Sequence, residues 1–458
     1  MTIKAAPKHE AGQVLPILAL ALVALLGFAA LALDGGNLYT EQRRAQAAAD
    51  NAVMAAAFVQ MNVITSTVSD WSGAAYANAA RNGYNLGGPG TTMAFHSPPT
   101  DGFYAGNSEY MEVVITQTVP TSLAHLVYRQ NPIPLTVIAI AHGKPSGPLM
   151  PGYALVAMKK ECDGSNTLYM DADGGGRTGG VYLTDGGAFV NAACPNALDA
   201  HGNHDGIVTD GPPINIAGTS YDGTVCTAAE VEDPSATCNF YPAPTTGAPQ
   251  VTQDPMAGTP AGTRPPCGPY MNLATELNDP VGIHPGSYTT LDSGNRDMNM
   301  RPGIYCLGSG KLSSGNGATT GIGVMIYMST TATTIDFSGS GSVNLHGPVA
   351  GDANGCTGVT DPSHDICKYL GILVYKTTGT NTCGQNDVEI DFTGSSSMRV
   401  IGMIYAPYSL VRYGGNGSLY LEGQTIAACV KFNGNGQINI IYNPRETYGP
   451  PPSVTLDQ

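Results

Sequence analysis

A short sequence recurs four times near the C-terminal end of this chain and constrains its fold most strongly. Each copy has a β-branched entry, an aromatic residue, a turn rich in Gly, Ser and Asn, and an alternating strand. A unit this short cannot bury its apolar residues alone, so each copy must stack on the next. Because the copies keep the same polarity, they predict the coils of a parallel β-helix. The copies are IDFSGSGSVNL (335–345), IDFTGSSSMRV (390–400), VRYGGNGSLYL (411–421) and VKFNGNGQINI (430–440).

The aromatic residue of each repeat is expected to fill the interior or to flank a turn in register. Further apolar runs at 323–328, 371–375 and 402–407 predict buried strands. Short, regular strands also suit an antiparallel β-sandwich, which is the alternative fold. The 59 glycines and 33 prolines follow no triplet period, so they fit strands joined by turns and exclude collagen. The four aromatic residues are Phe337, Phe392, Tyr413 and Phe432.

The rest of the C-terminal part is divided by composition. Residues 303–445 are predicted to form the main coils, and the similar composition of 145–220 predicts the first coils. Residues 221–302 are rich in proline and poor in apolar runs, so we expect a long insertion tied down by disulfides. Residues 446–458 are expected to form a tail.

An uninterrupted apolar run occupies residues 14–33. As a helix, it is long enough to cross a hydrocarbon core of about 30 Å. We therefore predict a transmembrane helix with the lipid bilayer as its partner, preceded by a cytoplasmic tail at 1–13. The alternative is a cleaved secretory signal. However, Asp34, Gly35 and Gly36 do not form the small-residue cleavage site that such a signal needs.

The cysteines indicate which part of the chain lies outside the membrane. All ten lie beyond residue 160 and none forms a C-x-x-C pair, which favours disulfides in an oxidising compartment over zinc sites or thiol catalysis. We therefore expect a single-pass protein of the cell membrane with a cytoplasmic N-terminus and an extracytoplasmic C-terminal part. The cysteines are Cys162, Cys194, Cys226, Cys238, Cys267, Cys306, Cys356, Cys367, Cys383 and Cys429.

Residues 34–84 are predicted to continue the helix outward with one alanine-rich face. Such a face suits close packing on other helices, or on a globular part of the same chain, and the pattern fits both. Residues 85–144 are expected to form a small αβ unit with strands near 111–118 and 135–140. The alanine-rich face comprises Ala45, Ala48, Ala49, Ala52, Val53, Ala56 and Val59.

Several N-terminal residues form a recognisable combination. Gly12 and Gln13 precede the apolar run, Asp34 follows it, and an R-x-x-x-A-A-D helix comes next, built on Arg44, Ala48, Ala49, Asp50, Ala52, Ala55, Ala56 and Ala57. This combination resembles the TadE/TadG-like family of Tad (tight adherence) pilus-assembly proteins. The junction between Gly12 and Gln13 resembles a prepilin processing site, although position 17 is Ile where a pilin would have Glu.

The resemblance implies a structural or adhesive protein associated with a Tad/Flp-type pilus or the cell envelope. Its implied partners are other pilus or envelope proteins, which would contact the alanine-rich helix, and a surface or glycan target. We expect no cofactor. Nucleic acid is not expected either, because a chain with a formal net charge of −15 offers no basic patch for phosphates.

Two groups of residues are candidates for chemistry. Asp199, His201, His204 and Asp205 are weak candidates for a metal site, and Asp171 with Asp173 faintly resembles a calcium loop. In the repeats, Asp336 and Asp391 occupy equivalent positions, which Arg412 and Lys431 occupy in the other copies, so we expect a ladder of partly paired charges. No nucleophile or phosphate-loop motif is present, and we expect no enzyme. The alternative is a membrane-tethered polysaccharide lyase or hydrolase that uses this aspartate row.

Overall fold

The chain forms two compact units in the computed structural model. One unit takes Met1–Ser146 and Pro452–Gln458, and the other takes Gly147–Pro451. The predicted fold class is confirmed: the chain is mostly β, with a long N-terminal helix. The structure describes residues 14–62, 71–107, 110–122, 132–144, 147–162, 169–171, 180–200, 206–231, 233, 236–358, 361, 364–384, 387–451 and 453–457.

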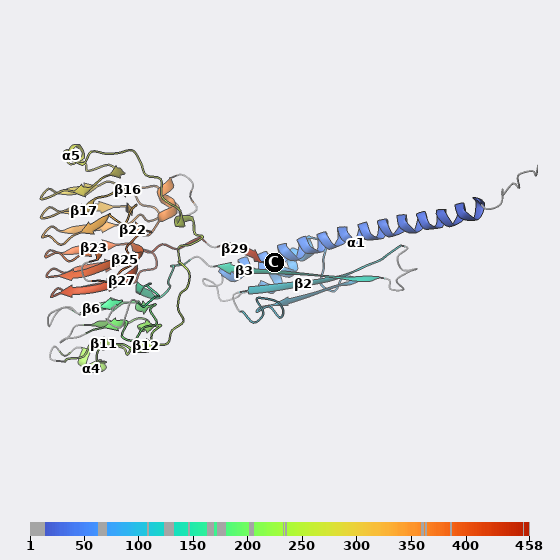
Figure 1. The fold of residues 1–458 in the computed structure, drawn as a ribbon, viewed down its shortest axis with the longest axis horizontal. Helices are drawn as coiled ribbons and strands as arrows, with labels where there is room; N and C mark the ends of the chain where they lie inside the picture. The colour runs from blue at the N-terminus through green and yellow to red at the C-terminus, as the bar shows by residue number, and fades with distance from the viewer. Residues whose placement is uncertain are drawn as a thin grey trace, which may run out of the picture. The chain divides into compact units, whose positions relative to one another are not determined.

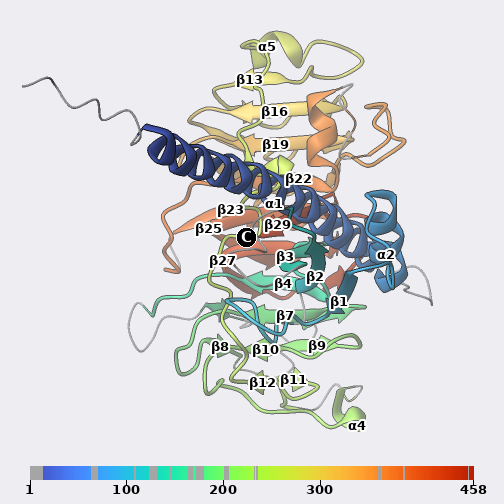
Figure 2. The ribbon, with the colours of Figure 1, turned by 90° about the vertical axis from the view of Figure 1, so that its right-hand side faces the viewer.

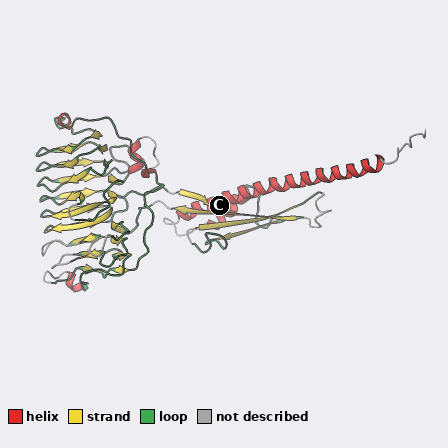
Figure 3. Cartoon of the chain, in the orientation of Figure 1, coloured by secondary structure: helices red, strands yellow, loops and turns green. Residues whose placement is uncertain are grey.

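The first unit packs helices on one antiparallel sheet (Figures 1 and 3). Helix α1 (Val14–Asn62) is followed by the shorter α2 (Trp71–Arg81). The strand order is β1-β2-β3-β29. The bounds are β1 (Thr91–His96), β2 (Tyr110–Val119), β3 (Ile133–Lys144) and β29 (Ser453–Asp457).

The last strand of this sheet comes from the far end of the chain, residues 446–458, where the sequence predicts only a tail. Strand β29 pairs antiparallel with β3, and His142 Nδ1 lies 3.1 Å from Asp457 Oδ2. Val454 and Leu456 pack against the core of the unit, which explains why this short alternating segment forms a strand. The second unit is therefore an insertion between two neighbouring strands of the first.

The second unit consists of parallel strands in three rows. Every strand pair among its described residues is parallel, so the antiparallel sandwich is wrong, and the unit is solenoid-like. The first two rows form one sheet, because β25 (Met403–Gly415) and β27 (Thr425–Gly434) run through both of them.

The other elements of this unit have the following bounds. The first row adds β12 (Thr245–Thr246), β10 (Asn215–Ile216), β7 (Gly187–Val190), β4 (Tyr153–Ala157), β22 (Ile372–Lys376), β19 (Val324–Met328), β16 (Gly303–Leu307) and β13 (Gly286–Tyr288). The second adds β8 (Leu198–Asp199), β5 (Met170–Asp171), β23 (Val388–Phe392), β20 (Thr334–Asp336), β17 (Lys311–Ser313) and β14 (Leu291–Asp292). The third contains β11 (Phe240–Tyr241), β9 (Ile207–Thr209), β6 (Val181–Thr184), β28 (Ile438–Ile441), β26 (Leu419–Glu422), β24 (Met398–Ile401), β21 (Val343–His346), β18 (Thr319–Ile322) and β15 (Met298–Met300). Short helical segments are α4 (Ala228–Val231), α5 (Leu273–Glu276), η2 (Pro260–Gly262) and η3 (Asp365–Tyr369).

The strand register reproduces the alignment of the four sequence repeats. Ile335 pairs with Ile390, and the next two copies continue this register through Val411 and Val430. The repeat aromatics are buried and form a continuous stack with ring centroids 5.8–5.9 Å apart. Aromatic stacking between coils thus fixes the register as well as filling the interior.

The chain enters this unit in the middle of the stack of coils (Figure 2). It winds from β4 to one end at β12, crosses to the other end, and winds back from β13 until β27 pairs with β4. The first and last coils are therefore neighbours, as the change of colour from red β27 to teal β4 in Figure 2 shows.

The proline-rich segment 221–302, expected to be an insertion, contributes to both ends of the stack. Strands β11 and β12 end one side, and β13 to β15 begin the other. Between them, Met256 and Ala261 pack against the outer side of the first row, beside Val156 and Met325. The crossing segment thus covers apolar side chains that would otherwise face water.

Candidate functional site

Helix α1 changes character along its length. Among the described residues, it is the one helix long and apolar enough to cross a membrane, with a mean hydropathy of 2.6 over its most apolar stretch. Nearly every side chain of its first part is exposed, from Leu15 (77%) to Leu33 (74%). A bare apolar surface of this size is typical of a segment that lies in lipid.

The alanine-rich face of α1 packs inside its own unit. Ala45, Ala49, Ala52 and Ala56 are fully buried against β2, β3 and α2. Of the two alternatives, packing on other helices or on a globular part of the same chain, the structure shows the second. The buried alanines are thus occupied by contacts within the unit, and the contact with pilus or envelope proteins expected through this helix stays a prediction.

Asp34 marks the transition between these two parts of α1. Its side chain is buried, and its Oδ1 accepts a hydrogen bond from the Ser122 backbone N–H at 2.9 Å, just after strand β2. A buried carboxylate needs such donors to offset its loss of hydration. The aspartate of the N-terminal motif therefore ties the helix to its own sheet.

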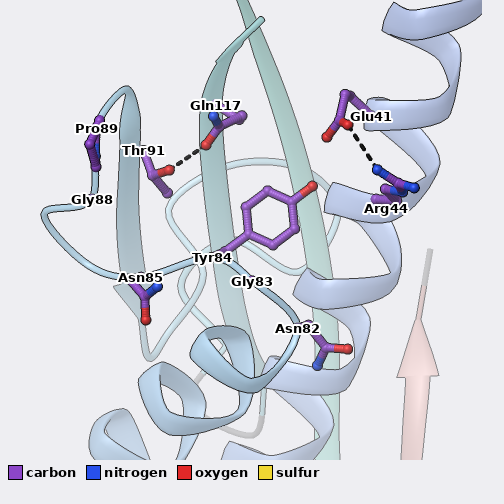
Figure 4. Close-up of a pocket in the computed structure, with 10 residues that line it drawn as sticks. All are labelled: Glu41, Arg44, Asn82, Gly83, Tyr84, Asn85, Gly88, Pro89, Thr91 and Gln117. Carbon is purple, nitrogen blue, oxygen red and sulfur yellow. Dashed lines mark hydrogen bonds and ion pairs between the residues drawn. The ribbon is translucent and has the colours of Figure 1, made fainter.

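A polar pocket of about 330 Å³ lies between α1 and the segment after α2 (Figure 4). Figure 4 shows the Tyr84 hydroxyl pointing toward Glu41 of α1. Glu41 also forms an ion pair with Arg44 at 3.1 Å. The lining residues are Glu41, Arg44, Asn82, Gly83, Tyr84, Asn85, Gly88, Pro89, Thr91 and Gln117.

The Tyr84 phenol of this pocket has a raised pKa. Burial, and then the nearby Glu41 carboxylate, raise the pKa of the Tyr84 phenol, so Tyr84 stays a neutral donor at physiological pH. Thr91 Oγ1 donates to Gln117 Oε1, which holds the opposite wall. The sequence did not predict this pocket, because its walls come from segments that lie far apart in the chain.

Of the four predicted metal-site residues, Asp199 is the one that lies among the residues that the structure describes. Asp199 is buried in β8, where it pairs in register with Asp171. His201, His204, Asp205 and Asp173 lie outside the described residues, as do Gly12 and Gln13 of the predicted processing junction. No group of three or more His, Cys, Asp or Glu within the described ranges could hold a metal ion.

All ten cysteines form disulfides, in agreement with the predicted framework. Each bridge lies within the second unit, and most tie a loop to a strand or to another loop. Cross-links of this kind stabilise mainly by restricting the unfolded chain. The pairs are Cys162–Cys194, Cys226–Cys238, Cys267–Cys306, Cys356–Cys367 and Cys383–Cys429.

The predicted ladder of charged side chains follows the second row of strands. Asp391 forms an ion pair with Arg412, and Lys431 Nζ lies 3.7 Å from Asp171 Oδ2. Asp336 is paired with Lys311 at 3.7 Å. Each of these three carboxylates therefore has a cationic neighbour, and the row consists of paired charges.

These features define a class: a protein anchored by one N-terminal apolar helix that carries a largely parallel β unit. Residues 12–60 match the family model described as putative Flp pilus-assembly TadE/G-like. No curated protein and no solved structure matches the chain. The N-terminal segment is thus TadE/G-like, and together with the apolar helix it indicates a membrane-anchored, pilus-associated protein.

Proposed function

We propose that this chain is a structural or adhesive protein of a Tad/Flp-type pilus or of the envelope around it. In this proposal residues 14–33 lie in the bilayer, the N-terminus is cytoplasmic, and residues 147–451 are displayed outside the cell membrane. The protein acts by display: the anchor holds the second unit at the surface, where it contacts a partner.

One observation carries this proposal: α1 buries its distal half in the first unit and leaves the apolar half bare. A helix of this kind has a fixed base outside the membrane and a free hydrophobic end. The five disulfides support an oxidising location for the second unit. A stiff, cross-linked surface also loses little conformational freedom when it binds.

Membrane retention tests the anchor. We expect the tagged full-length chain to stay with membranes after alkaline extraction and to release its C-terminal tag when intact cells are treated with protease. Leu25→Arg, in the exposed apolar half, should lower retention, because a charge at mid-bilayer costs about 2.5–3.5 kcal/mol. Phe58→Arg is the matched control, since Phe58 is exposed on the distal half of α1.

Pilus association is tested separately by purifying sheared pili and probing for the chain. Co-purification, or loss of pili when the chain is deleted, supports the proposal. A chain that is absent from pili and envelope fractions, with pilus number unchanged by its deletion, contradicts it. The mass of the native N-terminus then distinguishes a retained anchor from a chain cut at Gly12.

A further inference from the structure

A small pocket lies in the second unit beside the Cys267–Cys306 disulfide. Its volume is about 180 Å³, and it opens between the segment before α5 and the ends of strands β13 and β16. The side chains that matter for its chemistry are Arg264, Tyr270, Ser287, Thr289, Ser309 and Ser329. Strands β13 and β16 lie at one end of the stack of coils (Figure 2).

Tyr270 offers an aromatic face at this pocket. Its side chain is 71% exposed, which is unusual for a ring that the fold also fixes in place. Thr289 Oγ1, just after β13, donates a hydrogen bond to Tyr270 Oη at 3.3 Å, and the Tyr270 backbone bridges Ser287 of β13. A fixed, exposed ring can pack against the apolar face of a flat ligand at little entropic cost.

Arg264 gives the pocket a positive charge in an otherwise acidic chain. No carboxylate is among the residues that line it, although the formal net charge of the chain is −15. A guanidinium presents a rigid fork of donors that matches a carboxylate in two parallel hydrogen bonds. The charge of the pocket therefore complements one anionic group.

Hydroxyl groups from successive coils complete the lining. Thr289, Ser309 and Ser329 follow β13, β16 and β19, which are neighbours in the first row. Ser329 Oγ donates to the Leu307 carbonyl at 2.7 Å, and Ser287 Oγ donates to the Gly268 carbonyl at 2.7 Å. Their lone pairs can therefore accept hydrogen bonds from ligand hydroxyls.

The segment that carries Arg264 and Tyr270 is held in place before any ligand arrives. Pro265 and Pro266 restrict the backbone next to Arg264, and Cys267 is cross-linked to Cys306 of β16. On the other side, the Tyr369 hydroxyl donates to the Thr263 carbonyl at 3.0 Å. Such preorganisation reduces the ordering that binding would require.

We propose that this pocket binds the terminal acidic sugar of a surface glycan. The sugar carboxylate pairs with Arg264, one face of the ring packs on Tyr270, and ring hydroxyls donate to the serine and threonine oxygens. A long polyanion fits less well, because the chain as a whole is strongly negative and would repel it. The inference rests on the proposed display function and names the class of its target.

Binding of defined oligosaccharides to the full-length chain in detergent tests the pocket by calorimetry. We expect sialyllactose or a glucuronate-terminated oligosaccharide to bind, and lactose, which lacks the acidic sugar, to bind at least about tenfold more weakly. Arg264→Gln and Tyr270→Ala should each reduce affinity for the acidic oligosaccharide by about tenfold or more. Arg445→Gln and Tyr408→Ala, on exposed residues outside the pocket, are the matched controls.

Several outcomes would overturn the inference. Equal binding of lactose would remove the role of the carboxylate, and equal competition by inorganic phosphate or an acidic peptide would show a general anion site. Unchanged affinity in Arg264→Gln, with circular dichroism matching the parent, would place binding elsewhere. Binding of the acidic sugar by a chain that is absent from pili and envelope would support the pocket and refute the display function. A chain that is present there but does not bind the acidic sugar would refute the pocket alone.

Discussion

Lys376 carries its amino group into the interior of the second unit. Its Nζ donates to the Thr333 carbonyl at 2.7 Å and to the Thr330 carbonyl at 2.9 Å, and it lies 3.4 Å from Glu389 Oε2. Burial lowers the pKa of Lys376, while Glu389 acts in the opposite direction. The pair joins β22 to β23 across the first and second rows.

Removing one partner of this pair should destabilise the protein more than removing both. Lys376→Met leaves Glu389 buried without its cation, and we expect a loss of about 3–5 kcal/mol in the free energy of unfolding. Lys376→Met combined with Glu389→Leu should recover a large part of that loss. Urea unfolding followed by tyrosine fluorescence measures both. A double variant no more stable than the single one would contradict this account.

Gly415 shows why glycine recurs in the turns of the repeats. Its φ of +92° is left-handed, and a Cβ there would lie 2.2 Å from the Thr393 carbonyl oxygen of the neighbouring coil. We expect Gly415→Ala to lower the midpoint of urea unfolding clearly, because both the backbone and the stacking would have to shift. Gly358→Ala is the control, since a Cβ there meets nothing within 4 Å and we expect the midpoint to stay the same.

At the level of single residues, much of the pattern could be predicted from sequence. The aromatic stack and the charge row followed from the alignment of the repeats, because identical spacing forces identical register. The pairing of the cysteines could not, since sequence spacing does not determine connectivity. The pocket at Tyr270 was also missed, because Arg264 and Tyr270 lie in a segment without periodicity.

Helix α5 closes one end of the stack through a small polar network. Glu276 Oε2 accepts from the His284 backbone N–H at 2.8 Å and from its Nδ1 at 2.9 Å. Arg301 contacts both His284 Nε2 and Asp279. The backbone hydrogen bond from His284 is the main cause that lowers the pKa of Glu276. The ionised carboxylate thus stabilises the folded end.

This network predicts a dependence on pH. The pKa of Glu276 is lower in the folded than in the unfolded chain. Its contribution to the free energy of unfolding is therefore fully present above the unfolded pKa of about 4.3 and is lost as the pH falls through the folded pKa. Amides of residues 273–285 should exchange hydrogen faster in Glu276→Gln than in the parent at pH 7, and this difference should shrink as the pH is lowered and the carboxylate is protonated. Comparison at the same pH cancels the intrinsic exchange rate. A difference that does not change with pH down to acid unfolding would contradict the assignment.

At the level of elements, prediction succeeded where the pattern was long and failed where it was short. The apolar run and the alanine-rich helix were predicted as helical and form one continuous α1. Strands β13 to β15 were missed because each has only two or three residues within a proline-rich region. Strand β29 was missed because SVTLD stands alone at the chain end, without a turn signal beside it.

On the scale of the whole molecule, the two halves of the stack are joined by pairing between its first and last coils. Strands β4, β5 and β6 pair with β27 and β28. Cys162–Cys194 and Cys226–Cys238 lie before the segment that crosses from β12 to β13. The other three disulfides lie in that segment or after it, so no disulfide joins the two halves of the stack. No local signature marks such pairing, because the partners lie far apart in sequence.

This topology predicts that a cut in the crossing segment leaves the molecule intact. A protease site inserted after Gly247, where a Cβ would meet nothing within 4 Å, should allow complete cleavage. We expect the two fragments to stay together in size-exclusion chromatography in detergent, yet to separate in denaturing gels without reductant. The uncut protein with the same insertion is the control. Separation under native conditions would show that the coil pairing, together with the pairing of β29 with β3, is too weak to hold the fragments.

The position of the second unit between β3 and β29 has an evolutionary consequence. Its two ends meet at strands that are already neighbours, so the unit can be exchanged as a cassette without altering the anchor or its sheet. A lineage could keep one membrane-bound base and replace the surface module as its targets change.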